Sequence, residues 1–203
     1  MNEKGTARVE AFSDGVFAIA ITLLVLDLKV PTDTFTGDHA LLKALASERF
    51  WPNYLAFFLS FVSILVMWVN HHRIFTLVRT VDDAFLYWNG LLLLFVTFVP
   101  FPTSLLAAQF RGNAARGAAT MYAGTALAIA LAFTVLWRHA IRDARLLAPN
   151  TEAEVRELSQ QYRFGPVAYL IALGLAYFSA YASVGLCLFL VVAFAFRGLL
   201  GRK

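Results

Sequence analysis

The chain has 203 residues, of which 60% are hydrophobic and only 15% are charged, and its formal net charge is +4. A soluble domain of this length needs a largely solvated surface, so this composition excludes an ordinary soluble protein. It predicts instead an all-α integral membrane protein that crosses the bilayer several times.

Six apolar stretches predict helices that cross the bilayer core, given a rise of about 1.5 Å per residue. In chain order they cover residues 8–28, 51–76, 84–106, 116–137, 165–181 and 183–196. The last two are joined by almost no linker, which predicts a tight antiparallel hairpin. The segment 141–162 is expected to carry a short surface helix, capped by Asn150 or Thr151. Residues 1–203 thus form one expected transmembrane domain.

The positive charges predict how this domain is oriented. With the N-terminus inside the cell, twelve of the 17 Lys and Arg residues fall in inner segments and five fall in outer loops. Such a bias places both termini in the cytoplasm. The positive net charge therefore reflects membrane topology, and we expect no nucleic-acid partner.

Polar side chains gather at the cytoplasmic end of the first three predicted helices. An ionisable group near hydrocarbon is costly and usually has a partner or lines a wet cavity. The topology places at one depth the residues Arg8, Phe12, Ser13, Asp14, Trp68, His71, His72 and Asn89. The residues permit two interpretations. One is a hydrogen-bonded clasp that joins three helices, and the other is proton sensing or relay by Asp14, His71 and His72.

The two adjacent histidines do not predict a metal site. Neighbouring residues on a helix point about 100° apart, so His71 and His72 cannot chelate one ion together as an i, i+4 pair does. We therefore expect no metal within one subunit. The sequence also lacks an activated nucleophile or a nucleotide-binding loop beside these residues, so we do not expect an enzyme.

Behind Asp14, the first helix carries an apolar stripe. Ile19, Thr22, Leu23 and Leu26 follow the i, i+3, i+4, i+7 spacing of one helix face. Periodicity alone does not separate a pore-lining stripe from a packing stripe. Thr22 likewise permits a simple hydrogen bond back to its own helix.

Two motifs resemble a known family. The segment Arg8 to Asp14, with the sequence RVEAFSD, is similar to the RxxxFSD signature of the transmembrane protein 175 family of cation channels. The end of the second helix, from Trp68 to Phe75, resembles W-x-N-H-H-x-x-F of the family's prokaryotic members. The single six-helix unit is the bacterial arrangement.

The resemblance implies a homotetramer in a bacterial inner membrane, with the first helix of each subunit lining a central pore. Ile19 then forms the constriction, Thr22 a hydroxyl ring that contacts ions, and Leu26 a further apolar ring. The signature residues are implied to form an interhelical network. The expected function is K⁺ conduction with modest selectivity over Na⁺, because the chain has no TVGYG-like carbonyl filter. The expected partners are other copies of the chain, lipid, and K⁺ and other monovalent cations, with no cofactor beyond the permeant K⁺.

An alternative class is a proton-coupled secondary transporter that uses Asp14, His71 and His72 as titrating carriers. Paired carboxylates inside the helices and an inverted repeat would favour it, and the sequence shows neither. The channel is therefore the preferred interpretation.

Overall fold

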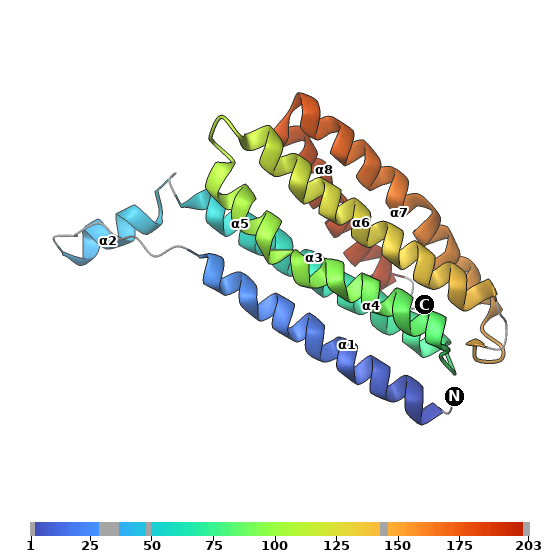
Figure 1. The fold of residues 1–203 in the computed structure, drawn as a ribbon. Helices are drawn as coiled ribbons and strands as arrows, with labels where there is room; N and C mark the ends of the chain where they lie inside the picture. Colours follow the sequence, from blue (N-terminus) through green and yellow to red (C-terminus); the bar gives the residue numbers. More distant parts are fainter. Residues whose placement is uncertain (1–2, 29–36, 48–49, 143–145, 201–203) are drawn as a thin grey trace.

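The computed structural model describes residues 3–28, 37–47, 50–142 and 146–200 as a bundle of helices (Figure 1). Its elements, in chain order, are α1 (Glu3–Leu23), the 3-10 helix η1 (Leu24–Asp27), α2 (Asp38–Leu45), α3 (Trp51–Leu77), α4 (Asp83–Phe98), α5 (Pro100–Gln109), α6 (Ala115–Arg142), α7 (Glu152–Phe178) and α8 (Ala180–Leu200). The short helix α2 lies to one side of the bundle (Figure 1). The start of α1 and the end of α8 point to the same end of the bundle (Figure 1).

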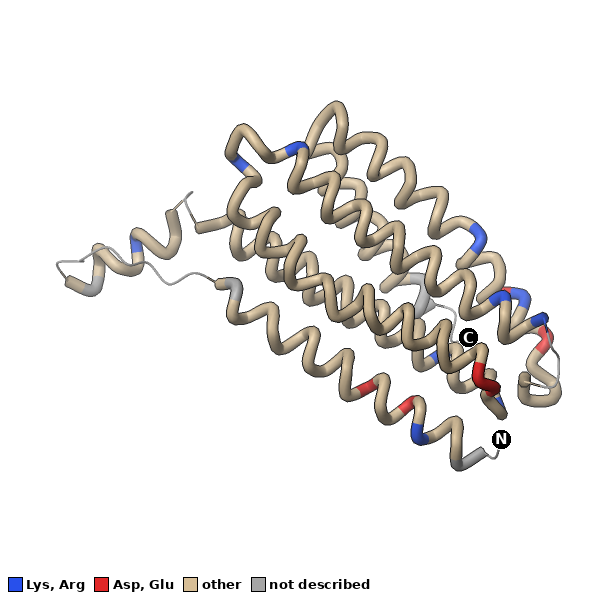
Figure 2. Tube along the Cα trace, viewed as in Figure 1, with Lys and Arg blue, Asp and Glu red and all other residues tan. Residues whose placement is uncertain are grey.

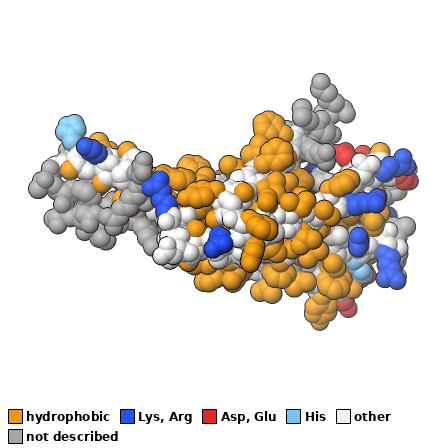
Figure 3. All heavy atoms as spheres, turned by 90° about the horizontal axis from the view of Figure 1, so that it is seen from above, with side chains coloured by type: hydrophobic (Ala, Val, Ile, Leu, Met, Phe, Trp, Pro, Cys, Tyr) orange, Lys and Arg blue, Asp and Glu red, His pale blue; other side chains and the backbone are white. Residues whose placement is uncertain are grey.

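Four helical segments are long and apolar enough to cross a membrane: Gly5–Leu26, Trp51–Leu77, Asp83–Gln109 and Ala115–Arg142. They correspond to the first four predicted crossings. The apolar part of α8, Ala180–Phe196, is shorter. Figure 2 shows Lys, Arg, Asp and Glu toward the two ends of the bundle, and Figure 3 shows apolar side chains over its central part.

The third predicted crossing is two helices rather than one. Helix α4 ends at Phe98 and α5 begins at Pro100, with Val99 between them. A proline has no N–H for the helix ladder and its ring clashes with the preceding turn. Pro100 and Pro102 therefore interrupt the ladder here. The N–H of Val99 instead bonds to the carbonyl of Val96 at 3.2 Å.

The fifth predicted crossing, 165–181, has a different start from the one expected. Helix α7 begins at Glu152, so the expected surface helix in 141–162 is the first part of the same helix. This first part is amphipathic, and its apolar side chains Leu158 and Tyr162 are buried against the bundle. Because that face is buried, the helix begins at Glu152, well before the apolar stretch that starts at residue 165.

Helix α7 also continues through Pro166. Pro166 cannot donate to the carbonyl of Tyr162, four residues earlier. The hydroxyl of Thr134 on α6 lies 2.8 Å from the carbonyl of Ala130 on its own helix and 3.2 Å from the freed carbonyl of Tyr162. Its one proton is shared between the two, so this neighbour satisfies the freed group in part, as adjacent helices do for prolines within a membrane.

Helix α1 lies along the outer side of the bundle, where it packs on α3 and α4 (Figure 1). Its buried side chains Phe17 and Ala20, with Leu24 of the following η1, join an apolar core that extends to α4, α6 and α7. A second apolar cluster lies among α3, α5, α6, α7 and α8. Thus α1 is held by one side only, and this position determines what its other side can do.

Candidate functional site

Helix α1 has one face packed into the bundle and an opposite face that is exposed. The packed face is made of Ser13, Phe17 and Ala20 and is continued by Leu24 of η1, and each is at most 1% exposed. The opposite face carries Phe12 and Ile19, which are 67% and 59% exposed, and is continued by Leu26 of η1, which is 76% exposed. Large apolar side chains thus form the outer surface of this helix.

Five of the exposed residues form a stripe along α1 that continues onto η1. Phe12, Gly15, Ile19 and Thr22 on α1 and Leu26 on η1 follow each other at alternating steps of three and four residues, and all are exposed. On α1 this is the spacing of a single helix face. The stripe contains the predicted constriction residues and the predicted hydroxyl, and below we call these five residues the α1 stripe.

Thr22 is the hydroxyl within the α1 stripe. Its Oγ1 donates to the carbonyl of Ile19 at 2.9 Å, which uses the single proton of the hydroxyl. The oxygen keeps its lone pairs, which can accept or coordinate. The helix-bonded hydroxyl therefore presents oxygen, not hydrogen, to whatever faces the stripe.

A chain of hydrogen bonds joins α1, α3 and α4 through buried side chains. The Nδ2 of Asn89 donates to the Oγ of Ser13 at 3.0 Å, and Ser13 in turn donates to the carbonyl of Val9 at 2.8 Å. The Oδ1 of Asn89 therefore faces His71, whose Nε2–H donates to it at 2.9 Å. We call Ser13, Asn89 and His71 the buried clasp.

His71 is fully buried within the clasp. Its ring lies between Phe17 and Phe75, with centroid distances of 5.3 Å and 4.5 Å. Its Nδ1 has no hydrogen-bond partner among the described residues. The neutral tautomer with the proton on Nε2 fits this arrangement, because Nδ1 then needs no acceptor.

Two further contacts join α1 to α3 nearer the surface. The indole Nε1 of Trp68 donates to Oδ1 of Asp14 at 2.8 Å. One turn along α3, Nδ1 of His72 lies 2.9 Å from Oε1 of Glu10. Of the candidate donors for Asp14 at this depth, Trp68 is the one that reaches it. Asp14 and Glu10 are four residues apart, so both carboxylates face α3.

Glu10 was missed by the sequence analysis. It lies at one of the three variable positions of the RxxxFSD pattern, so the motif does not mark it. Its spacing from Asp14 was the available signal, because residues four apart share a helix face. If Asp14 is expected to face α3, this spacing predicts that Glu10 faces α3 as well.

Arg8 and Phe12 lie outside these contacts in the single chain. Both are exposed, and they line a surface groove between α1 and α4. The expected interhelical network therefore contains Ser13 and Asp14 of the signature, with Trp68, His71, His72 and Asn89. Arg8 and Phe12 belong to the outer face of α1.

The described residues contain no group of three or more His, Cys, Asp or Glu side chains that could hold a metal ion. His71 points to Asn89 on α4, whereas His72 points to Glu10 on α1. The two imidazoles thus serve different helices, in keeping with their adjacent positions on α3.

A family model and individual relatives both match this chain, and both agree with the family resemblance of the two sequence motifs. A family model described as "Endosomal/lysosomal potassium channel TMEM175" matches residues 8–100. The chain is 57% identical to a protein of Chamaesiphon minutus named as a potassium channel, over 95% of this chain and 94% of that protein. It is 45% identical to a potassium channel of Streptomyces collinus, over 89% of this chain and 85% of that protein.

A solved structure agrees with the fold. The crystal structure of a lysosomal potassium-selective channel TMEM175 homolog from Chamaesiphon minutus superimposes with a TM-score of 0.85 at 55% identity. The match covers 96% of this chain and 98% of that chain. The relatives are named as ion channels rather than enzymes, which confirms the expectation that this protein is not an enzyme. Identity at this level over nearly the whole of both chains shows that this multi-pass membrane protein belongs to the TMEM175 family.

Proposed function

We propose that this chain is one subunit of a homotetrameric K⁺ channel in which four copies of α1 line a central pore. Support comes from nearly full-length likeness to proteins named as potassium channels. The observation that carries the proposal is the exposed α1 stripe, since α1 packs on α3 and α4 with one face and leaves the stripe uncovered.

The position of α1 suits a shared axis. Helix α1 lies along the outer side of the bundle (Figure 1), so its exposed face is available to a second copy of the chain. The presence of Gly15 and a hydroxyl in the stripe also fits close helix contact better than a purely lipid-facing surface. The stripe is thus the surface that a second copy would meet.

Ile19 is the proposed constriction and Leu26 a further apolar ring. Both side chains are large and more than half exposed in the single chain. Four such side chains around an axis exclude water, and a dewetted segment stops ions without any physical plug. Opening requires the four helices to splay or rotate until water enters.

Thr22 is the proposed ion contact, because its oxygen keeps lone pairs while its proton is held by Ile19. Four hydroxyl oxygens offer few ligands to a partly dehydrated cation. A site with few, flexible ligands discriminates weakly, so the proposed preference for K⁺ over Na⁺ is modest.

The remaining features follow from this assembly. The subunit crosses the membrane six times, with both termini cytoplasmic, in the cell membrane of a bacterium. The buried clasp and the Asp14–Trp68 contact fix the rotation of α1 so that the stripe faces the axis. The channel needs lipid and its own copies as partners, and its only ligand is the permeant cation.

The transporter alternative gains no support from the side-chain geometry. A carrier needs titrating groups that exchange protons along a path. Among the described residues, Asp14 is bonded to Trp68, while His71 is bonded to Asn89 in a separate buried site. The contacts fix helices together and do not connect Asp14 with His71.

Flux into liposomes tests the proposal. Purified protein is reconstituted with K⁺ inside and an impermeant cation outside, and efflux is followed without any proton or Na⁺ gradient. We expect K⁺ to leave the liposomes without any added K⁺ ionophore. Efflux that appears only when a proton gradient is imposed would show a coupled transporter instead.

A further inference from the structure

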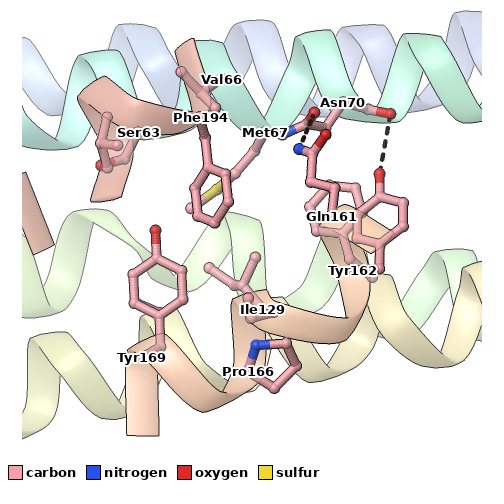
Figure 4. Close-up of a pocket in the computed structure, with 15 residues that line it drawn as sticks. Ser63, Val66, Met67, Asn70, Ile129, Gln161, Tyr162, Pro166, Tyr169 and Phe194 are labelled. Carbon is pink, nitrogen blue, oxygen red and sulfur yellow. Dashed lines mark hydrogen bonds between the residues drawn. The ribbon is translucent and has the colours of Figure 1, made fainter. Parts of the chain in front are cut away.

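Two adjoining cavities lie inside the subunit, away from α1, among α3, α6, α7 and α8. The larger has a volume of about 60 Å³ and is the one drawn in Figure 4. The smaller has a volume of about 20 Å³. Ser63, Ala126 and Tyr169 line both cavities. Both lie within one subunit, so what they bind does not depend on the proposed tetramer.

The phenol of Tyr169 lies at the boundary of the two cavities with an unused proton. Its hydroxyl makes no hydrogen bond to another described residue, while its ring centroid lies 6.4 Å from that of Phe194. Figure 4 shows this hydroxyl directed toward Ser63. A buried phenol normally finds a partner, because an unpaired polar group in an apolar surrounding costs free energy. Tyr169 thus offers one free donor.

Three other hydroxyl groups line the smaller cavity, those of Ser63, Tyr122 and Thr125. Two of them give their proton to their own helix: Ser63 donates to the carbonyl of Leu59 at 2.6 Å, and Thr125 donates to the carbonyl of Met121 at 2.9 Å. Because a hydroxyl has one proton and two lone pairs, both oxygens are left as acceptors.

The proton of Tyr122 is assigned by the residues beyond it. Thr103 donates to the carbonyl of Val99 at 2.8 Å, so it accepts from Ser60, whose Oγ lies 2.6 Å away. Ser60 has then used its proton, and Tyr122, whose hydroxyl oxygen is 3.3 Å from it, is the donor in that contact. The oxygen of Tyr122 is therefore an acceptor toward the cavity, like the other two.

The smaller cavity thus presents three acceptors and one free donor, from α3, α6 and α7. The ligand that matches them donates two hydrogen bonds and accepts one. It must also be small, since a single water needs about 10–15 Å³ and the cavity has about 20 Å³. A cation does not match, because the described residues that line this cavity carry no charged side chain to offset its lost hydration.

We propose that the smaller cavity binds one ordered water molecule, which accepts from Tyr169 and donates to Ser63 and Tyr122. The water joins α7 to α3 and α6 inside the second apolar cluster. Through Tyr122 it is continuous with the bonds to Ser60 and Thr103, so one chain of neutral hydroxyl groups connects α5, α3, α6 and α7.

X-ray radiolysis tests the proposal on the full chain in liposomes. The pulse splits water into hydroxyl radicals where the water lies, and these oxidise nearby side chains, which mass spectrometry maps. The reporters are Tyr122 and Cys187, which line the smaller cavity and are 6% and 1% exposed, so radicals formed in bulk solvent do not reach them. Trp137 is the reference, because it is 1% exposed and lines neither cavity. We expect both reporters to be oxidised several times faster than Trp137.

Two variants make the test specific. Ala126→Leu fills the space and should abolish oxidation of Tyr122 and Cys187. Tyr169→Phe removes only the free donor and should lower their oxidation by up to about fivefold, the effect of one hydrogen bond of about 1 kcal/mol. Tyr177→Phe on the same helix is the matched control, because Tyr177 is 75% exposed and lines neither cavity. The wild-type comparison needs no variant, so it decides the question where a variant fails to fold.

Two results would overturn the proposal. One is oxidation of Tyr122 and Cys187 no faster than that of Trp137, which would show a dry cavity. The other is oxidation of the two reporters that Ala126→Leu leaves unchanged, which would show that the radicals come from elsewhere. K⁺ efflux is measured on the same liposomes. Intact efflux with a dry cavity would refute this site alone and leave the proposed channel standing.

Discussion

Ile19 and Thr22 lie on one face of α1, and their side chains do opposite things there. Ile19 offers only hydrocarbon, whereas Thr22 has its proton tied to the Ile19 carbonyl at 2.9 Å and offers an oxygen. An ion that follows the α1 stripe would thus meet a barrier and a weak ligand one helical turn apart. Each property can be removed separately.

Ile19→Asn tests the barrier. An amide at the constriction holds water, so the closed pore should leak, and K⁺ efflux should rise at least about tenfold, equivalent to ~1.4 kcal/mol off the barrier. The measurement is efflux from liposomes at matched protein density. Ala18→Asn is the control, because Ala18 is also exposed on α1 but points about 100° away. Equal efflux from both variants would remove Ile19 from the constriction.

Thr22→Val tests the ligand. Valine keeps the shape and loses the oxygen, so the permeability ratio of K⁺ to Na⁺ should fall toward one while current persists. Reversal potentials under bi-ionic conditions measure it. Thr97→Val is a closely matched control, since Thr97 is exposed and bonds back to Leu94 at the same 2.9 Å. A ratio that stays at its wild-type value in Thr22→Val would contradict the assignment.

At the scale of helices, the buried clasp determines how α1 is rotated about its own axis. Asn89 on α4 is its centre, because it bonds Ser13 on α1 and His71 on α3 at once. Phe17 and Leu24 then face inward, and the α1 stripe faces outward. A clasp of two bonds thereby controls the direction of side chains several turns away.

Asn89→Leu should lower the thermal stability of the protein, because it leaves the buried Nε2–H of His71 without an acceptor, which costs about 1–3 kcal/mol. Ser13 also loses the amide that donates to it but keeps its own bond to Val9. Unfolding in mild detergent measures it. A double-mutant cycle with Ser13→Ala supplies the control: the two losses should be non-additive, as they are for residues in one network. Additive losses would show that Ser13 and Asn89 are not coupled.

Helix α7 receives part of the hydrogen bond that Pro166 removes from a residue on another helix. Thr134→Val should destabilise the protein by up to about 1 kcal/mol, because the carbonyl of Tyr162 loses the hydroxyl proton that it shares with the carbonyl of Ala130. In a Pro166→Ala background the helix regains its own N–H, so the same change should cost much less. Both are measured as shifts in unfolding temperature, and an equal shift in both backgrounds would contradict the role of Thr134.

The sequence predicts these elements unevenly, for physical reasons. The apolar lengths of α3 and α6 are a local property, so their positions could be predicted. The start of α7 at Glu152 could not, because burial of Leu158 and rescue by Thr134 come from α6 and neighbouring helices. Likewise, the predicted depth in the membrane placed Trp68, His71 and Asn89 near Asp14. Which of them bonds to Asp14 depends on the rotation of each helix about its axis, and that rotation is determined by packing between helices.

At the scale of the whole molecule, the proposed assembly makes the exposed α1 stripe a contact between subunits. The chain mass is 22.5 kDa, so native mass spectrometry in mild detergent should find a species of about four times that mass. A monomer has no central axis and would refute the proposed pore.

Disulfide crosslinking gives the geometry of the assembly. The chain has a single cysteine, Cys187, so a Cys187→Ser background is free of thiols. Leu26→Cys in that background should form intersubunit dimers on oxidation, because the proposed pore brings four copies of this position together. Phe189→Cys, which is 65% exposed on α8, is the control and should not crosslink. The reverse pattern would place α8 at the axis.

The clasp also has a consequence for how the protein is made. Ser13 and Asn89 are 76 residues apart, so α1 leaves the ribosome well before its partner exists. At about 5–20 residues per second, the interval is roughly 4–15 seconds. During that time the Ser13 hydroxyl can stay bonded to Val9 within its own helix, at the 2.8 Å seen in the finished fold. The Ser13 hydroxyl can therefore wait in the bilayer with its donor already bonded, so for this contact the order of synthesis does not conflict with the order of assembly.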